Sequence, residues 1–210
     1  AGPIGCELSQ AFARFGSEVV LVEALHGIIP NEDRRGAEIV LKQMQRDGVQ
    51  LRCCGKNLQI RKQSDGIHMF VDSHGSHYDE RVDRILVGVG RKPNVEGLNL
   101  EAAGVEYDKT GVKVNERLQT SNRRIYAAGD ICYPYKFTHT ADATARIVIQ
   151  NALFFGRSKT SALHIPWCTY TDPEVAHVGL YPKQAQEKGM EVETITVEMD
   201  SVDRAILEGD

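Results

Sequence analysis

The residue pair Gly129-Asp130 has the clearest potential for chemistry, because it follows a short apolar run, 125–128, that is typical of a β-strand. From about Thr140 the apolar spacing becomes helical, which predicts a helix with Thr140 as its N-cap and Asp142 in its first turn. A carboxylate where a strand ends can accept hydrogen bonds from the hydroxyls of a ribose-like polyol, and the free N–H groups that start the next helix can bind an anion. An ordinary strand, loop and helix in which Asp130 only caps a turn would leave the same pattern.

A second pattern of glycines and an acid opens the chain. Gly2 and Gly5 lead into a helical pattern, and the strand that follows, 18–22, closes on Glu23. A glycine-rich helix start lets a pyrophosphate approach the backbone, and an acid about 20 residues further on accepts from ribose hydroxyls. The first glycine of the full fingerprint and the first strand would precede this sequence, so a methyltransferase cofactor loop or a plain tight turn stays open. The apolar residues of the expected helix are Ile4, Leu8, Ala11, Phe12 and Phe15.

The elements between these two patterns alternate as in a doubly wound domain. A helix is expected over 33–47 and a parallel strand over 49–53, followed by β segments over 59–61 and 67–71 that a Ser-Asp-Gly turn joins. The run 84–90 predicts a buried strand that breaks into a Gly-Arg-x-Pro-Asn turn, and a small hairpin is expected around 109–111. A strand that alternates with helices in this way is typical of an α/β fold with a parallel sheet.

Composition and charge exclude several classes of partner. The chain is 41% hydrophobic and 26% charged, as in ordinary globular proteins, and its formal net charge of −4 leaves no basic surface for nucleic acid or an anionic membrane. No apolar run approaches the roughly 20 residues that a spanning helix needs. An odd number of cysteines without a secreted-type framework indicates reduced thiols and a cytoplasmic location. These cysteines are Cys6, Cys53, Cys54, Cys132 and Cys168.

The spacing of cysteines and histidines predicts no metal site. Cys53 and Cys54 are adjacent, and two packing thiols at a strand start are the preferred interpretation, with a vicinal disulfide as the alternative. His74, His77 and Asp79 lie near a Gly-Ser turn, where loose spacing of this kind is typical of a solvated loop.

Taken in order, the motifs resemble those of the pyridine nucleotide–disulfide oxidoreductases, the family of glutathione reductase, dihydrolipoamide dehydrogenase and mercuric reductase. The run 120–130, with Tyr-Ala-Ala-Gly-Asp at its end, resembles the second FAD motif of that family. The Gly-Arg-x-Pro-Asn turn at 90–94 resembles the crossing from the NAD domain to the FAD domain, where Arg91 would anchor the boundary. The Pro-Glu-x-Ala-x-Val-Gly segment at 173–179 resembles the opening of the dimer-interface domain.

The resemblance implies an α/β architecture in three parts. A Rossmann-like, doubly wound NAD(P)-binding domain without its first strand is expected over 1–90, and the C-terminal segment of an FAD-binding domain over 91–157. The start of an α+β dimerisation domain, truncated at the end of the sequence, is expected over 158–210, with a helix near 183–188 and a strand at 192–197.

The resemblance also implies two cofactors, FAD and NAD(P), with NAD preferred. Glu23 would take the adenosine ribose and repel a 2′-phosphate, and Ala24-Leu25-His26 supply no adjacent arginine. Arg34 and Arg35, which would favour NADP, follow further along the chain. Asp130 would hold the ribityl chain of FAD, and Glu7 would sit under the flavin. The expected cofactor-binding residues are Gly2, Pro3, Ile4, Gly5, Glu7, Glu23, Gly90, Gly129, Asp130, Phe137, Thr138 and His139.

Within the family, 137–139 and 165–170 resemble mercuric-reductase-like members. The implied reaction passes a hydride from NAD(P)H to FAD and electrons on to a disulfide or metal-ion acceptor, in a homodimer. The redox cysteine pair and the histidine base would lie outside this sequence, so no catalytic residue is expected in it. We expect a central fragment that binds FAD weakly or not at all. The alternative is a truncated, non-catalytic nucleotide-binding or oligomerisation module.

Overall fold

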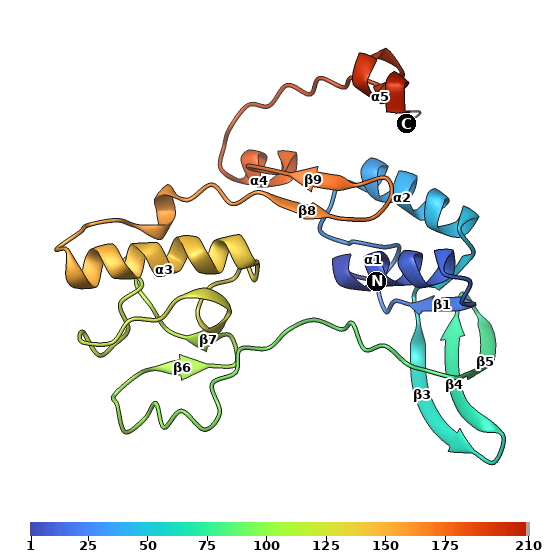
Figure 1. Cartoon of the computed structure of the whole chain (residues 1–210), viewed down its shortest axis with the longest axis horizontal. Coiled ribbons are helices and arrows are strands. Elements are labelled where there is room, and N and C mark those ends of the chain that lie inside the picture. The colour runs from blue at the N-terminus through green and yellow to red at the C-terminus, as the bar shows by residue number, and fades with distance from the viewer. Residues whose placement is uncertain (209–210) are drawn as a thin grey trace. The chain divides into compact units, whose positions relative to one another are not determined.

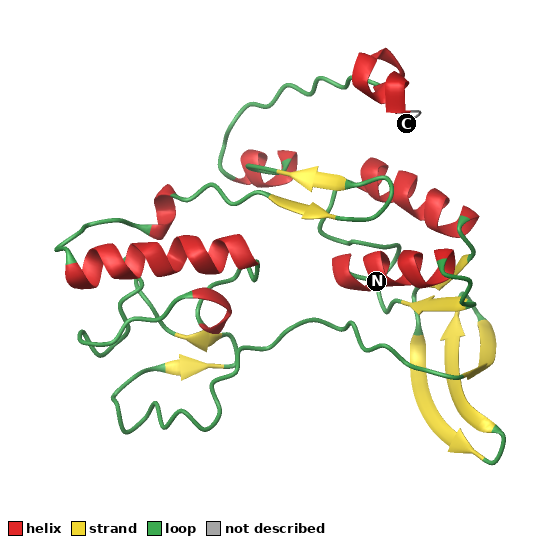
Figure 2. Ribbon diagram, viewed as in Figure 1, coloured by secondary structure: helices red, strands yellow, loops and turns green. Residues whose placement is uncertain are grey.

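The chain divides into two compact units in the computed structural model, which describes residues 1–208. The first unit combines Ala1–Val89 with Cys168–Asp210, and the second unit is Gly90–Trp167 (Figure 1). Helices and strands occur in both units (Figure 2). The chain is therefore mixed α/β, as the sequence predicts.

A parallel pair of strands forms the centre of the first unit. β1 (Val19–Val22) lies beside β2 (Val49–Arg52), with Val19 opposite Val49 and Val22 opposite Arg52. α1 (Pro3–Arg14) precedes β1, and α2 (Arg34–Arg46) connects the two strands, because parallel neighbours need a long crossover. The predicted helices and the predicted parallel strand are confirmed.

α2 shows how the sequence specifies this core. The Asp33 carboxylate accepts from the backbone N–H groups of Arg35 and Gly36, at 2.9 and 3.4 Å, and so caps the helix. One stripe of the helix is buried, and burying each large apolar side chain contributes about 1.5–3 kcal/mol. The stripe and its partners form a single cluster: Ala1, Cys6, Leu21, Ile28, Ile29, Ala37, Val40, Met44 and Val49.

An antiparallel sheet completes the N-terminal part of the first unit. It has the order β3 (Lys56–Gln63), β4 (Gly66–Ser73) and β5 (Ser76–Val82). β4 buries every second residue towards its end, as a strand with one covered face does. The sequence analysis missed β5 and expected a solvated loop around His77 and Asp79, because this strand is polar and mostly exposed.

Two predicted strands are wrong. The run 84–90 is irregular, with Val87 75% exposed and Val89 89% exposed, and 192–197 is irregular as well, with Ile195 82% exposed. An apolar run forms a ladder only beside a neighbouring strand, and no strand within residues 1–208 pairs with either run.

The predicted apolar face of α1 is also largely uncovered. Ile4 and Phe12 are each 47% exposed and Phe15 is 84% exposed, while the helix buries Gly5, Cys6 and Gln10. Gly5 lies close to β1, and a Cβ at this position would be 3.9 Å from Leu21 Cδ1.

The second unit contains a short hairpin and one long helix. The hairpin of β6 (Tyr107–Asp108) and β7 (Gly111–Val112) is the one predicted around residues 109–111. The short 3₁₀ turns η1 (Gly129–Ile131) and η2 (Thr160–Ala162) flank α3 (Thr138–Leu153) along the chain. This unit has a small hydrophobic core of its own.

Details of the α3 prediction need correction. α3 begins at Thr138 after an extended Phe137, so Thr140 is not its N-cap but a fully buried residue inside it. Asp142 lies beyond the first turn and pairs with Arg146 at 2.8 Å. The predicted strand at 125–128 is reduced to one isolated bridge, from Tyr126 to Gln119, because no longer strand runs alongside it.

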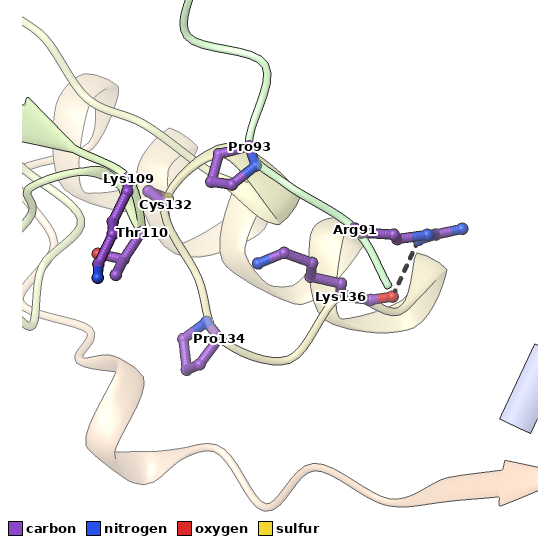
Figure 3. A pocket seen from close by; sticks show the side chains of 7 residues that line it. All are labelled: Arg91, Pro93, Lys109, Thr110, Cys132, Pro134 and Lys136. Carbon is purple, nitrogen blue, oxygen red and sulfur yellow. Dashed lines mark hydrogen bonds between the residues drawn. The ribbon is translucent and has the colours of Figure 1, made fainter. Parts of the chain in front are cut away.

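A pocket of about 400 Å³ lies in the second unit (Figure 3). Arg91 borders it and donates through Nη1 to the carbonyl oxygen of Lys136, at 3.2 Å. Three of its lining side chains are cationic, which suits an anion. The lining residues are Arg91, Pro93, Lys109, Thr110, Cys132, Pro134 and Lys136.

The first unit resumes at Cys168, within the strand β8 (Trp167–Thr169), which pairs with β9 (Val175–His177). α4 (Pro182–Glu187) follows and agrees with the predicted helix. η3 (Met199–Ser201) and α5 (Asp203–Glu208) close the described chain. Within residues 1–208, no helix has both the length and the apolar character that crossing a bilayer requires.

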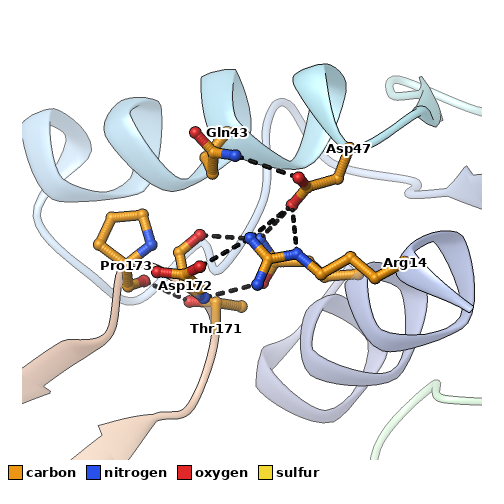
Figure 4. A network of polar contacts seen from close by, with 7 residues as sticks. Arg14, Gln43, Asp47, Thr171, Asp172 and Pro173 are labelled. Atoms are coloured by element: carbon orange, nitrogen blue, oxygen red, sulfur yellow. Dashed lines mark hydrogen bonds and ion pairs between the residues drawn. The ribbon is translucent and has the colours of Figure 1, made fainter. Parts of the chain in front are cut away.

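A polar network joins α1, the end of α2 and the loop between β8 and β9 (Figure 4). Gln10, which is 3% exposed, donates to the Asp47 carboxylate and to the Asp172 carbonyl, both at 2.7 Å. The Asp172 N–H donates back to Gln10 Oε1 at 2.8 Å. Arg14 pairs with Asp47 at 3.0 Å and with Asp172 at 2.7 Å. The Asp47 carboxylate thus interacts with both Gln10 and Arg14.

We predict that this network makes stability depend on acid pH. Burial opposes the ionisation of Asp47, but hydrogen bonds from Gln10, Arg14 and Gln43 outweigh it and lower the pKa of Asp47. A carboxylate with a lowered folded pKa contributes stability above its unfolded value, about 3.9, and loses that contribution as pH falls through the folded pKa. Urea unfolding should show Asp47→Asn less stable than the parent at neutral pH, with the gap closing below about pH 4. A gap that is independent of pH would contradict this.

A second prediction concerns the packing of the β6–β7 hairpin. Gly111 has φ +120°, and a Cβ there would overlap the Ile131 carbonyl and lie 3.2 Å from Pro93 Cγ. Gly111→Ala should cost about 2–5 kcal/mol, from left-handed backbone and overpacking together. The control Gly104→Ala, with φ +66° and open space, should cost only about 1–2 kcal/mol. Equal losses in thermal unfolding of the two variants would refute the packing argument.

Candidate functional site

The first group of predicted residues surrounds the start of α1. Gly2 is the N-cap in an extended conformation, and no side chain of the described chain caps this helix. Pro3 has no N–H, and the Cys6 N–H already donates to the Gly2 carbonyl at 3.0 Å. The N–H groups of Ile4 and Gly5 therefore have no acceptor within the helix, and two such groups at a helix start suit a phosphate oxygen.

Glu23 lies directly after β1, at the carboxyl end of the parallel pair. Its carboxylate accepts from the Leu25 N–H at 2.9 Å and from the α-ammonium of Ala1, and its side chain is 14% exposed. The carboxylate thus accepts a backbone hydrogen bond at the strand end where the sequence predicts a contact with the adenosine ribose. The side chain remains an anionic hydrogen-bond acceptor.

Three further side chains of the first unit have defined partners. Glu7 accepts from the Tyr170 N–H at 2.8 Å. Arg34 donates to the carbonyls of Ile28 and Glu32, and Arg35 pairs with Glu198. Both arginines are thus engaged in contacts within the unit.

The second group of predicted residues lies around Gly129. This buried residue has φ +73°, and a Cβ there would lie 3.2 Å from Ala141 Cβ, so the turn needs glycine. The Gly129 N–H donates to Thr144 Oγ1 at 3.0 Å, which fixes the turn against α3. Asp130 is half-exposed and accepts from Arg91 Nη1 at 3.0 Å. Asp130 therefore presents a carboxylate in a 3₁₀ turn rather than at the end of a parallel strand.

The start of α3 completes this group. Phe137 is its extended N-cap and no side-chain hydrogen bond caps the helix, so the N–H groups of Thr138, His139 and Thr140 lack helical acceptors. The rings of Phe137 and His139 stack at 5.4 Å, and Phe137 stacks on Trp167 at 6.2 Å. His139 Nε2 lies 2.8 Å from the Pro166 carbonyl, so this nitrogen donates the hydrogen bond.

The structure therefore brings the predicted residues together in two groups, one in each unit. Gly90 begins the second unit with φ +105° and open space around its Cα. Its neighbour Arg91 ties this start of the unit to Asp130. The sequence analysis missed the cationic pocket next to Asp130, because Lys109 and Lys136 come from separate loops whose approach no local spacing reveals.

Two family models match the chain. Residues 1–145 match the pyridine nucleotide-disulphide oxidoreductase model, and residues 165–210 match the dimerisation domain of pyridine nucleotide-disulphide oxidoreductases.

Curated relatives have two different functions in their names. A dihydrolipoyl dehydrogenase of Thermus scotoductus is 38% identical over 91% of this chain and 42% of its own length. A mercuric reductase of Staphylococcus aureus is 36% identical over 99% of this chain and 38% of its own length. The chain spans about 40% of the length of these relatives.

Solved structures agree with this assignment. The HOCl-induced flavoprotein disulfide reductase RclA from Escherichia coli matches with a TM-score of 0.85 and 28% identity, over 100% of this chain and 48% of that protein. The mixed α/β fold is that of the flavoprotein disulfide reductases. Together with the two model matches, this shows that the chain belongs to the pyridine nucleotide–disulphide oxidoreductase family.

Proposed function

We propose that the chain is the NAD(P)-binding, partly FAD-binding and dimer-forming portion of an NAD(P)H oxidoreductase that uses FAD. In this proposal, residues 1–90 bind NAD(P), residues 91–157 form part of the FAD-binding domain, and residues 158–210 begin the dimerisation domain. The single observation that carries the proposal is the anionic Glu23 at the carboxyl end of β1, next to the uncapped start of α1. A carboxylate acceptor beside free N–H donors matches the sugar and phosphate groups of a dinucleotide.

NAD is the proposed nicotinamide cofactor rather than NADP. The negative charge of Glu23 would repel a 2′-phosphate on the adenosine ribose. Arg34 and Arg35, the two arginines that follow in the chain, are engaged with backbone carbonyls and with Glu198. This arrangement supports a site that takes the unphosphorylated ribose.

The residues around α3 fit one part of FAD. Asp130 offers a half-exposed acceptor for ribityl hydroxyls, and the uncapped N–H groups at Thr138 and His139 offer donors for the pyrimidine edge of the flavin. A helix start stabilises a negative charge by about 0.3–1 kcal/mol, which favours an anionic reduced flavin. When bound, FAD supplies the step that takes a hydride from NAD(P)H and passes electrons onward.

The proposed acceptor is a disulfide or a metal ion, in a cytoplasmic homodimer with mercuric-reductase-like specificity. The segments 137–139 and 165–170 support this subclass, and curated relatives of similar identity are named mercuric reductase and dihydrolipoyl dehydrogenase. The five free cysteines support a reducing compartment. A non-catalytic nucleotide-binding or oligomerisation module is the second candidate, supported by the match of residues 165–210 to a dimerisation domain.

An absorbance experiment separates the two candidates. The protein expressed from its complete reading frame should show flavin bands that NADH bleaches under anaerobic conditions, and an added acceptor should restore them. NADH binding without flavin bands, in a protein that is folded by circular dichroism, would favour the module.

We also predict a specific role for Glu23 in nucleotide choice. Glu23→Gln keeps the size of the side chain but removes its charge, so NADH binding to the 210-residue chain should weaken about tenfold, as expected for losing a charged hydrogen bond. NADPH binding should weaken less, because the repulsion of the 2′-phosphate is lost. Glu18→Gln, an exposed acid at the other end of β1, is the matched control. Equal losses for NADH and NADPH, measured by calorimetry, would contradict the role.

A further inference from the structure

Four side chains of the first unit meet where three of its loops converge. His26 lies in the loop after β1, Cys53 and Cys54 follow β2 directly, and His74 lies in the turn between β4 and β5. Their two sulfur atoms and two ring nitrogens all lie within 4.8 Å of one another. Cys53 Sγ is 3.0 Å from His74 Nε2, and Cys54 Sγ is 3.5 Å from His26 Nδ1.

Further hydrogen bonds hold the three loops together independently of these four side chains. The Cys54 N–H donates to the Leu25 carbonyl at 3.0 Å, and the Gly55 N–H donates to the Glu23 carbonyl at 2.8 Å. Ser73 Oγ donates to the Cys53 carbonyl at 2.6 Å. The loops are thus fixed in a position that keeps the four donor atoms close, which is the pre-organisation that a ligand site needs.

Two of the four residues have an unusual backbone conformation. Cys54 has φ +54° and His74 has φ +49°, in the left-handed region that residues other than glycine rarely adopt. Conformations of this kind concentrate at ligand and active sites, where the surrounding structure maintains them. Cys53 is 9% exposed and His26 is exposed, so the cluster has a buried side and a side open to an incoming ion.

We propose that His26, Cys53, Cys54 and His74 bind a zinc ion. Two thiolates and two imidazoles in a compact cluster are a typical tetrahedral donor set for Zn²⁺. Binding releases the two thiol protons as two Zn–S bonds form, and no oxidant or reductant is required. The sequence analysis assigned no metal because the four ligands come from three loops, with a spacing that matches no zinc motif. The inference does not rest on the proposed function.

The test uses the reduced, metal-free 210-residue chain under anaerobic conditions. Zn²⁺ titrated against a chromophoric chelator should bind at one equivalent per chain and raise the melting temperature, because the ion binds the folded state. Co²⁺ should give the intense visible bands of tetrahedral coordination together with thiolate-to-cobalt charge-transfer absorption. A six-coordinate cobalt spectrum without thiolate absorption would overturn the proposal.

Variants connect the binding to these residues. Cys54→Ser and His74→Asn should each lower zinc affinity at least about tenfold, since even outer-shell changes at metal sites cost that much. Asn tolerates the left-handed backbone of His74. Cys168→Ser and His77→Asn change a thiol and an exposed imidazole elsewhere in the same unit and should leave the affinity unchanged.

Three further results would overturn the proposal, provided that circular dichroism shows native fold. They are less than stoichiometric zinc on the parent chain, ligand variants that bind as tightly as the controls, and a Cys53–Cys54 disulfide that persists in reductant and prevents binding.

Discussion

The parallel pairing of β1 with β2 is the constraint on which the chemistry of the first unit depends. Its register, with Val22 beside Arg52, ends both strands at the same edge of the pair. The loop after β1 therefore carries Glu23 to the same edge at which Cys53 and Cys54 leave β2, and the Glu23 carbonyl accepts from the backbone just beyond them. Parallel pairing requires a long crossover, and the capped, amphipathic α2 supplies it together with much of the core.

The helices α1, α2 and α3 differ in whether a side chain accepts hydrogen bonds from the backbone N–H groups of the first turn. α2 begins with Asp33, whose carboxylate satisfies two backbone N–H groups, and no predicted site residue lies at its start. α1 and α3 begin with Gly2 and Phe137 in extended conformations and without side-chain caps. Uncapped donors cost stability unless water or a ligand satisfies them. The uncapped starts of α1 and α3 each lie near a carboxylate, Glu23 for α1 and Asp130 for α3.

Local sequence signals predicted the elements that local interactions form. The caps and periodicity of α2 and the turn residues between β6 and β7 are examples. Prediction failed where structure depends on a distant partner: 84–90 is apolar but has no neighbouring strand in the described chain, and β5 is polar but pairs along its full length with β4. The cluster of His26 with Cys53, Cys54 and His74 was missed for the same reason. The order of the motifs alone, by contrast, predicted the family, and the matches to the two family models confirm it.

The central claim is that the carboxyl end of the β1–β2 pair, with the start of α1, forms the nicotinamide nucleotide site. Hydrogen–deuterium exchange of the chain with and without NADH tests this most directly, because it reports backbone protection segment by segment. We expect new protection at residues 2–5 and 23–26, with the β3–β5 sheet unchanged. Protection that is absent from these two segments while NADH is bound, or that is confined to the sheet, would contradict it.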